Sequence, residues 1–217
     1  MKTNRTLKVL ATALAAAGIV AFTSPAMAGS ATDTAAAFSV PIQHDFTIVI
    51  PSFLYFRVGP GNPFGGADSG AIGLITFTAT VTNAGDGSSI AGTGGDAGGN
   101  AATVAVRANR GQVTITESNN SGGNGLGTGD PLDGYISYSE ITTAATNASL
   151  PAPVLSNGGG GTSAPTLGRD AGVGGLKVTD RAGTWQYTYS NNVLPSAGTY
   201  GAGGGSGGSV TYTATTP

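Results

Sequence analysis

The chain has 217 residues and no cysteine, and only 9% of its residues are charged, with nine Lys or Arg against eleven Asp or Glu. Ordinary soluble domains carry about 25% charged residues, so Gly, Ser, Thr and Asn must supply the solubility, as in extracellular structural proteins. The cations are scattered singly along the sequence, which disfavours nucleic acid and anionic membranes as partners, because both need clustered positive charge. With one histidine and no cysteine, the chain lacks the residues for a Cys–His catalytic pair or a common zinc site.

The first 28 residues have the pattern of a cleavable signal peptide. A basic start is followed by an apolar stretch over residues 9–22, and Ala26-Met27-Ala28 is a small-x-small cleavage site. The apolar stretch is shorter than the roughly 20 residues that a membrane-spanning helix needs. We expect residues 1–28 to be removed and the mature chain to be exported across an inner membrane, to the periplasm, the cell surface or the medium. Cleavage leaves six basic residues against eleven acidic ones, a net charge of −5.

After a small, polar and flexible leader over residues 29–37, the sequence predicts a long strand that opens the fold. Residues 38–50 are apolar at every second position except His44, which is the period of a half-buried strand. Pro41 lies on the opposite parity and cannot donate a ladder hydrogen bond. We therefore expect an edge strand, two strands with a break, or a strand that swaps partners. The apolar side chains of this alternation are Phe38, Val40, Ile42, Phe46, Ile48 and Ile50.

Further short strands follow along the chain. We expect them at residues 53–58, 72–81, 103–106, 112–116, 135–141, 184–189 and 209–214, with Gly-rich loops at 85–100, 118–131 and 156–175. Asn109-Arg110-Gly111 predicts a tight hairpin between two of these strands. Residues 176–178 lead through residues 180–183 into the strand at 184–189. No segment after the signal peptide has the apolar period of a helix. The pattern predicts an all-β chain with a single domain over residues 38–217, an Ig-like β-sandwich of about eight to ten strands.

The residues that carry enzyme chemistry are few. His44, the only histidine, has a parity that would point it inward, and we expect a buried or edge histidine rather than a catalytic base. No serine lies in a G-x-S-x-G elbow. Glu117 and Glu140 could be read as a glycosidase pair, but solvated surface positions are the simpler interpretation. The sequence therefore predicts a protein that is not an enzyme.

Four acidic residues in Gly-rich loops raise the question of calcium, which takes six to eight oxygen ligands. They are Asp86, Asp96, Asp130 and Asp133. No EF-hand loop and no G-G-x-G-x-D repeat is present, and aspartate is common in turns. We expect turn-forming aspartates and no cofactor, with calcium at these loops as the alternative.

Trp185, Tyr187 and Tyr189 alternate with polar residues, so all three rings share one face of a strand. Either that face belongs to the core, which we expect, or it is a stacking platform for sugars. The second interpretation corresponds to a monomeric secreted carbohydrate-binding or adhesive module.

The layout as a whole resembles secreted bacterial Ig-like surface proteins, and among these the subunits of chaperone–usher fimbriae. It has a signal peptide, a small-residue leader, a long alternating strand and a Thr/Tyr-rich last strand after Ala197-Gly198-Thr199-Tyr200. The resemblance implies a pilus or cell-surface subunit that takes part in adhesion and assembles by strand addition between chains. Residues 38–50, called the N-terminal segment below, would then be the donor. The implied partners are other copies or related surface subunits, and a periplasmic chaperone. If the last strand closes the fold, residues 38–50 are instead the first strand of a monomer.

Overall fold

The computed structural model describes residues 32, 34, 40–67, 69–70, 73–169, 175–202 and 206–217. The predicted signal peptide, most of the leader and Phe38 lie outside the described residues. The chain divides into two units, Met1–Val49 and Ile50–Pro217. The second, called the folded unit below, contains every strand of the described residues.

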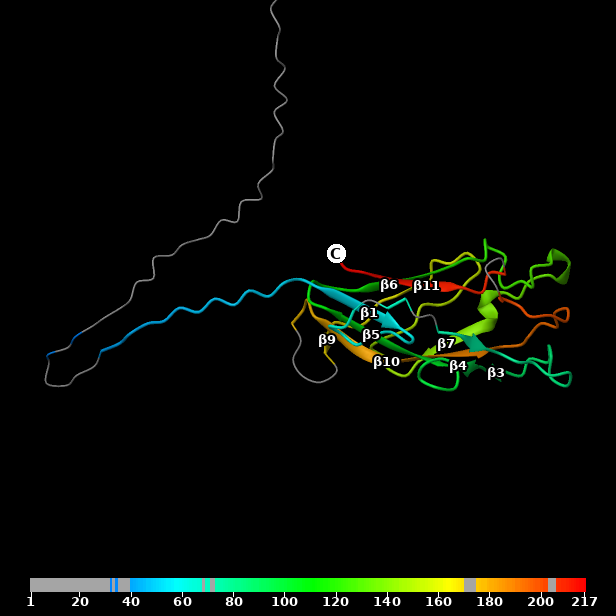
Figure 1. The fold of residues 1–217 in the computed structure, drawn as a ribbon, viewed down its shortest axis with the longest axis horizontal. Helices are drawn as coiled ribbons and strands as arrows, with labels where there is room; N and C mark the ends of the chain where they lie inside the picture. The colour runs from blue at the N-terminus through cyan, green and yellow to red at the C-terminus, as the bar shows by residue number, and fades with distance from the viewer. Residues whose placement is uncertain are drawn as a thin grey trace, which may run out of the picture. The chain divides into compact units, whose positions relative to one another are not determined.

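The folded unit is built of β-strands and two short 3-10 helices, with no α-helix among the described residues (Figure 1). In chain order the elements are β1 (Leu54–Val58), β2 (Ile75–Thr76), β3 (Ile90–Ala91), β4 (Thr93–Gly94), β5 (Ala101–Ala108), β6 (Thr114–Asn119), η1 (Pro131–Asp133), η2 (Tyr138–Glu140), β7 (Ile141–Ala145), β8 (Thr162–Ser163), β9 (Gly168–Arg169), β10 (Thr179–Tyr189) and β11 (Val210–Thr215). Strands pair antiparallel except β9 with β10. The prediction of a β-rich chain is confirmed.

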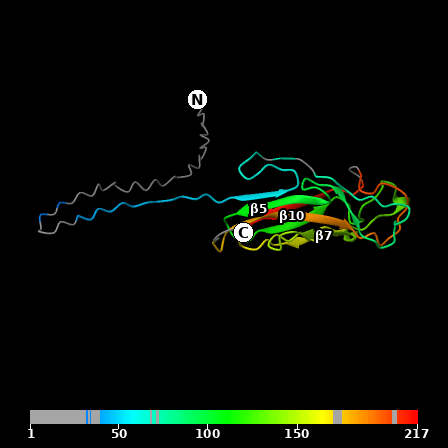
Figure 2. The ribbon, with the colours of Figure 1, turned by 90° about the horizontal axis from the view of Figure 1, so that it is seen from below.

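Three sheets hold these strands. The largest has the order β1-β5-β10-β3, and β7 and β9 also pair with β10. A second sheet has the order β11-β6-β8, and β2 pairs with β4 in a third. β5, β10 and β7 run side by side in Figure 2. β10 therefore organises the largest sheet, since it pairs with four other strands.

The predicted hairpin at residues 109–111 is wrong. β5 pairs with β1 and β10, whereas β6 pairs with β11 and β8, so the connection crosses from one sheet to another. Both edges of β5 are occupied, and it has no free edge for β6. The crossing lets Val104 and Val106 of β5 and Ile115 of β6 all bury their side chains in one core. Gly111 adopts φ 132° within the crossing, a conformation that favours glycine.

The strand expected at residues 184–189 is longer than predicted, because residues 180–183 also belong to the continuous strand β10. Eight residues of β10, Thr179 to Gln186, pair with β5. Glycine at position 183 leaves room for Asn147 beside the strand, since a Cβ atom at Gly183 would lie 3.0 Å from the Cβ of Asn147. Asn147 also donates to the Ala182 carbonyl oxygen over 2.9 Å. Tertiary pairing with β5 thus extends the strand towards its N-terminus beyond the alternating aromatic residues.

Other strand boundaries differ from the predicted ones. Within the described part of residues 72–81 only Ile75–Thr76 form a strand, and residues 135–141 hold η2 before β7 begins. The predicted loops at 85–100 and 156–175 contain the two-residue strands β3, β4, β8 and β9. These pairs are too short to leave an alternating pattern in the sequence.

The Gly-rich loops contain positions at which only glycine fits. A Cβ atom at Gly161 would collide with the carbonyl oxygen of Val154, and one at Gly208 with the carbonyl oxygen of Gly201. Backbone atoms cannot move aside as a flexible side chain can. Glycine therefore lets neighbouring backbone segments approach closely in these loops.

The expected strand over residues 38–50 is absent from its described part. Residues 40–50 are assigned to no strand, although their alternation predicted one. Gln43 Nε2 donates to Asp45 Oδ1 over 2.9 Å, which places two side chains of the same parity on one side of the backbone. A strand needs a partner for its backbone groups, and residues 40–50 have no ladder partner in this single chain.

One hydrophobic core receives side chains from both larger sheets. Trp185 of β10 is fully buried, and its ring lies 5.2 Å from that of Tyr212 on β11. The Trp185 indole nitrogen donates to the Leu150 carbonyl oxygen over 3.0 Å, and the Tyr187 and Tyr212 hydroxyls are 3.1 Å apart. With no disulfide available, these contacts and the apolar burial around them stabilise the fold.

We expect Trp185→Ala to destabilise the protein by about 3–5 kcal/mol, because it leaves a large cavity and an unpaired carbonyl oxygen. The measurement is the free energy of unfolding in urea, followed by circular dichroism. Val154→Ala, at a side chain that is 73% exposed, is the control and should change stability by less than about 0.5 kcal/mol. Unchanged stability of the Trp185 variant would contradict the structural role of this ring.

Candidate assembly surface

The N-terminal segment carries the largest group of exposed apolar side chains that lie close together in sequence. Phe46 is 89% exposed, Ile48 84% and Ile50 74%, and Val40 and Ile42 are also exposed. Soluble proteins seldom leave so many large apolar side chains in water, and such groups usually mark an interaction site. Phe38 lies outside the described residues. His44 is exposed in this segment, whereas its parity predicted a buried or edge position.

Two edge strands of the folded unit have unpaired sides. β1 pairs only with β5, and β11 only with β6, among the described strands. β1 and β11 are neighbours although they belong to different sheets. An unpaired strand edge presents free N–H and C=O groups and is a template for pairing with another chain.

The core is incompletely covered along these two edge strands. Phe56 and Val58 of β1 pack against the core but stay half-buried, and so do the alternate residues Val210, Tyr212 and Ala214 of β11. The intervening threonines of β11 are exposed. An apolar strand added beside β11 would complete the burial of these side chains.

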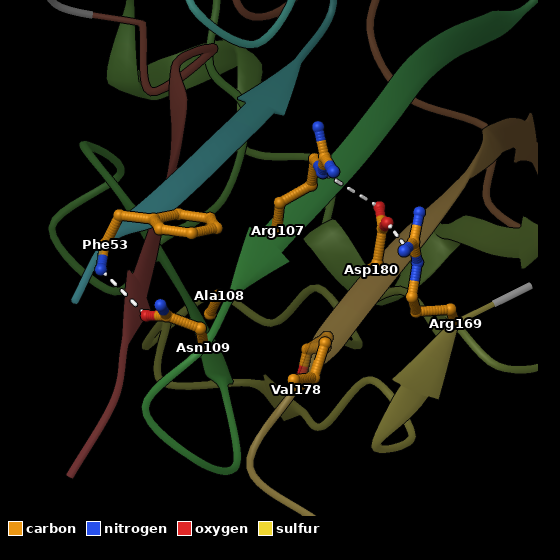
Figure 3. A pocket seen from close by; sticks show the side chains of 8 residues that line it. Phe53, Arg107, Ala108, Asn109, Arg169, Val178 and Asp180 are labelled. Carbon is orange, nitrogen blue, oxygen red and sulfur yellow. Dashed lines mark hydrogen bonds and ion pairs between the residues drawn. The ribbon is translucent and has the colours of Figure 1, made fainter. Parts of the chain in front are cut away.

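The point where the N-terminal segment meets the folded unit is fixed by Asn109. Its side chain accepts from the Phe53 backbone N–H over 2.9 Å (Figure 3). It also donates to the Pro51 carbonyl oxygen over 2.8 Å. The Phe53 ring lies 5.2 Å from the ring of Phe64. The chain thus enters β1 at the end of β5 where Asn109 lies.

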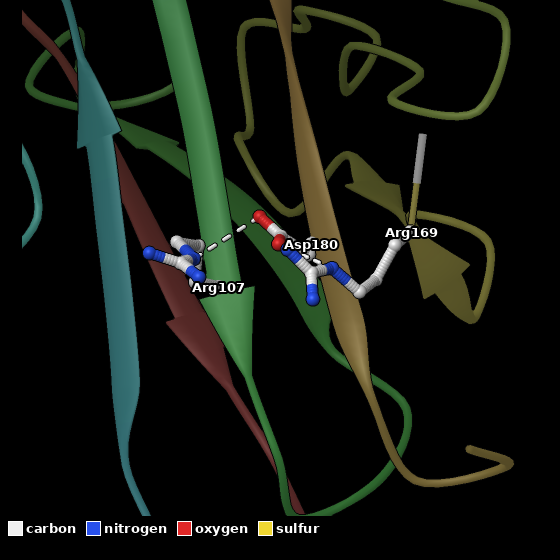
Figure 4. A network of polar contacts seen from close by, with 3 residues as sticks. All are labelled: Arg107, Arg169 and Asp180. Atoms are coloured by element: carbon white, nitrogen blue, oxygen red, sulfur yellow. Dashed lines mark ion pairs between the residues drawn. The ribbon is translucent and has the colours of Figure 1, made fainter. Parts of the chain in front are cut away.

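A shallow pocket of about 160 Å³ lies at the same end of β5 (Figure 3). Its lining includes Phe53, Asn109 and three charged residues, Arg107, Arg169 and Asp180. Arg107 Nε and Arg169 Nε lie 3.1 and 3.0 Å from the two carboxylate oxygens of Asp180 (Figure 4). The guanidinium of Arg107 also lies 4.4 Å from the centre of the Phe64 ring.

Glu117 is buried in the core, so its predicted solvated position is wrong. Its Oε1 accepts from Asn119 Nδ2 over 2.8 Å, while Oε2 has no partner among the described residues. Glu140 lies at the surface and accepts from the Asn192 backbone N–H over 3.0 Å. A glycosidase pair needs two carboxyl groups that reach a substrate, and the fully buried Glu117 does not.

The other residues singled out by sequence lie as follows. Trp185, Tyr187 and Tyr189 are 0%, 7% and 8% exposed and therefore present no open ring face to a sugar. Asp86, Asp96 and Asp130 accept backbone hydrogen bonds from Ser88, Thr103 and Leu132, and Asp133 accepts from the Thr128 hydroxyl. Hydrogen bonds from Ser88 lower the pKa of Asp86. Within the described ranges, no three Asp, Glu, His or Cys side chains group as metal ligands would.

Comparisons with protein-family models, with curated proteins and with solved structures found no match to this chain. In the part of the chain that the structure describes, no helix is long and apolar enough to cross a membrane.

The tyrosines of the core predict a loss of stability at alkaline pH. Burial, and secondarily the charge of Glu117, raises the pKa of Tyr138 from 10.0 to about 12, and burial also raises the pKa of Tyr187 and Tyr212. The folded state favours the neutral phenol. Its contribution is therefore complete below pH 10 and is lost as the pH rises towards 12.

We expect the free energy of unfolding in urea to fall across this pH range, together with the appearance of tyrosinate absorbance. Tyr138→Phe removes one of these groups, so its free energy of unfolding should depend less steeply on pH in the same range. A free energy of unfolding that stays constant up to pH 12 would contradict the assignment.

Proposed function

We propose that the chain is a non-catalytic structural subunit of a bacterial cell-surface polymer, with an Ig-like β-sandwich fold formed by the two larger sheets. The N-terminal segment of one copy adds as a strand to the free edge of β11 in the next copy. A periplasmic chaperone would cover the same edge before assembly, and related subunits could take the place of identical ones. Strand addition of this kind joins chains by backbone hydrogen bonds and by alternate apolar side chains.

The observation that carries this proposal is the match between an uncovered apolar segment and an incompletely covered core. Residues of the N-terminal segment are apolar at every second position, and side chains two residues apart in a strand lie roughly 6.6 Å apart on one face. The half-buried residues Val210, Tyr212 and Ala214 have the same spacing. Full burial of a Phe or Ile side chain stabilises by about 1.5–3 kcal/mol relative to leaving it exposed.

Two alternatives receive less support. A monomer that uses residues 38–50 as its own first strand needs these residues in a strand, and residues 40–50 are assigned to none. A monomeric carbohydrate-binding module would expose an aromatic platform, and the three rings expected to form it are buried. The polymer uses the exposed apolar residues of the N-terminal segment, which the carbohydrate-binding module leaves unexplained.

We expect Ile48→Asp to block polymer formation, because a charged side chain would enter an apolar groove at a cost of several kcal/mol. The matched control is Val49→Asp, since Val49 is equally exposed, at 87%, but has the opposite parity and would face away from the groove. The measurement is the amount of sheared surface polymer, by negative-stain microscopy and light scattering. Normal polymer from the Ile48 variant, or equal loss from both variants, would contradict strand donation.

Engineered cysteines test β11 as the acceptor. The natural chain has no cysteine, so a disulfide can form only between introduced positions. Thr47→Cys is combined in turn with Thr211→Cys, Thr213→Cys or Thr215→Cys, three exposed residues of β11. We expect oxidised polymers of one pairing to give a ladder of multiples in denaturing gels, and single-cysteine variants to stay monomeric. Polymers that yield no ladder with any pairing would exclude β11 as the acceptor.

A further inference from the structure

The folded unit has four of its six basic residues at one end. Arg107 and Asp180 lie directly opposite each other in the β5–β10 ladder, and Arg169 pairs with Asp180 from β9. Arg110 follows the end of β5, and the Lys177 carbonyl oxygen accepts from the Gly111 backbone N–H over 3.0 Å. We call Arg107, Arg110, Arg169 and Lys177 the basic end. Asp180 is its one side-chain carboxylate among the described residues, and Pro217, the last residue of the sequence, lies beside Gly111 at this end. Asp170 and Asp68 lie outside the described residues.

The arginines of this end keep donors available for another anion. Both contact Asp180 through Nε, so each guanidinium engages the carboxylate with one edge only (Figure 4). Asp180 is the carboxylate that both arginines share in these ion pairs. One carboxylate faces two guanidinium groups here, and they line a pocket that opens to solvent. A second carboxylate would therefore be attracted to these two guanidinium groups.

The acidic side chains lie at the opposite end of the same sheet. Glu140 immediately precedes β7, whose first residue pairs with Tyr189 at the end of β10, and it accepts from Asn192. Asp86 accepts from Asn191 over 3.3 Å, just beyond the same strand end. Asp96 lies beside the start of β5. Asp133 is joined to the loop after β10, since its carbonyl oxygen accepts from the Tyr200 hydroxyl over 3.2 Å. With Asp130, these residues form the acidic end.

The two ends cannot neutralise each other within one copy. Nine steps from residue to residue along β10 lead from Asp180 to Tyr189, which corresponds to roughly 30 Å of strand. Charges that far apart are screened at physiological salt, where the Debye length is about 8 Å. The loops of the acidic end and the strand ends of the basic end lie at opposite ends of the folded unit in Figure 1.

We propose that the basic end of one copy docks on the acidic end of the next, as an electrostatic head-to-tail contact between neighbouring subunits. This inference rests on the proposed polymer and deepens it by identifying the faces that meet. A head-to-tail contact uses two different surfaces and leaves one of each free, so it propagates into a filament instead of closing a dimer. Opposite charges on the two surfaces steer encounter and set the order of subunits.

The same contact brings the N-terminal segment of one copy, the proposed donor strand, to the interface with the next copy. The N-terminal segment leaves the folded unit at Pro51, which Asn109 fixes at the basic end. The neighbour's acidic end is the end at which β11 begins, since Val210 pairs with Asn119 there. A donor that enters from this side runs antiparallel to β11, with Ile50 near Val210 and Phe46 near Ala214. Its apolar residues then share the face of Val210, Tyr212 and Ala214, and Thr47 lies opposite Thr213.

Two charge variants of the full chain test the docking. The basic-end variant carries Arg110→Glu, Arg169→Glu and Lys177→Glu and keeps the Arg107–Asp180 pair. The acidic-end variant carries Asp86→Asn, Asp130→Asn, Leu132→Lys and Leu194→Lys. The asparagines keep a side-chain oxygen at each turn, and the two leucines are 91% and 72% exposed. Neither variant alters the N-terminal segment or β11, and circular dichroism checks that each is folded.

We expect each variant alone to form at least about tenfold less surface polymer than the natural chain, since like charges then meet at every joint. Cells that produce both variants should regain polymer, because each variant offers the end that complements the other. A chain that carries all seven changes should also form polymer.

Mature Ile48→Asp protein, which cannot donate its strand, should still associate weakly at low salt. That association should weaken about tenfold by roughly 0.5 M NaCl.

The outcomes separate the two proposals. Normal polymer from both charge variants, or loss of polymer without rescue by co-expression, would overturn the docking. Strand donation would then be judged by the polymer that the Ile48→Asp variant forms. Normal polymer from Ile48→Asp together with rescue between the charge variants would overturn strand donation and retain the docking.

Discussion

The ladder between β5 and β10 is the constraint on which the other features depend. Its eight residue pairs hold the two longest strands together, and the alternation along β10 sends Trp185, Tyr187 and Tyr189 to the buried side. The same register places Arg107 opposite Asp180 on the other face. Core packing and the charge pattern of one end therefore follow from a single antiparallel pairing.

With no disulfide and few charged residues, stability must come from burial and from hydrogen bonds. Asparagine side chains link loops to strands by hydrogen bonds: Asn109 holds the entry to β1, Asn147 the middle of β10 and Asn191 the loop before β3. Glycine complements them by letting backbone segments approach closely, as at Gly161 and Gly208. A chain with this composition can thus form structured loops without charged side chains.

The proposed assembly divides affinity and order between two kinds of interaction. Burial of the alternating apolar side chains of the N-terminal segment would supply most of the affinity, because it removes large hydrophobic surfaces from water. Contact between the basic and acidic ends would contribute less energy at physiological salt, but it would align the copies before the strand is inserted. Both interactions converge where Asn109 fixes the chain at Pro51.

The sequence by itself determined the β-rich character, the positions of β1 and β11 within one or two residues, and the shared face of Trp185, Tyr187 and Tyr189. Period-two alternation is a local property and can be read from neighbouring residues. Only the tertiary structure decided that β5 and β6 lie in different sheets, that Gly183 continues a strand and that Glu117 is buried. Each of these depends on which distant strand supplies a partner. The same holds for charge: Arg107, Arg110, Arg169 and Lys177 are scattered in the sequence, and strand pairing brings them to one end because β5 and β10 run in opposite directions.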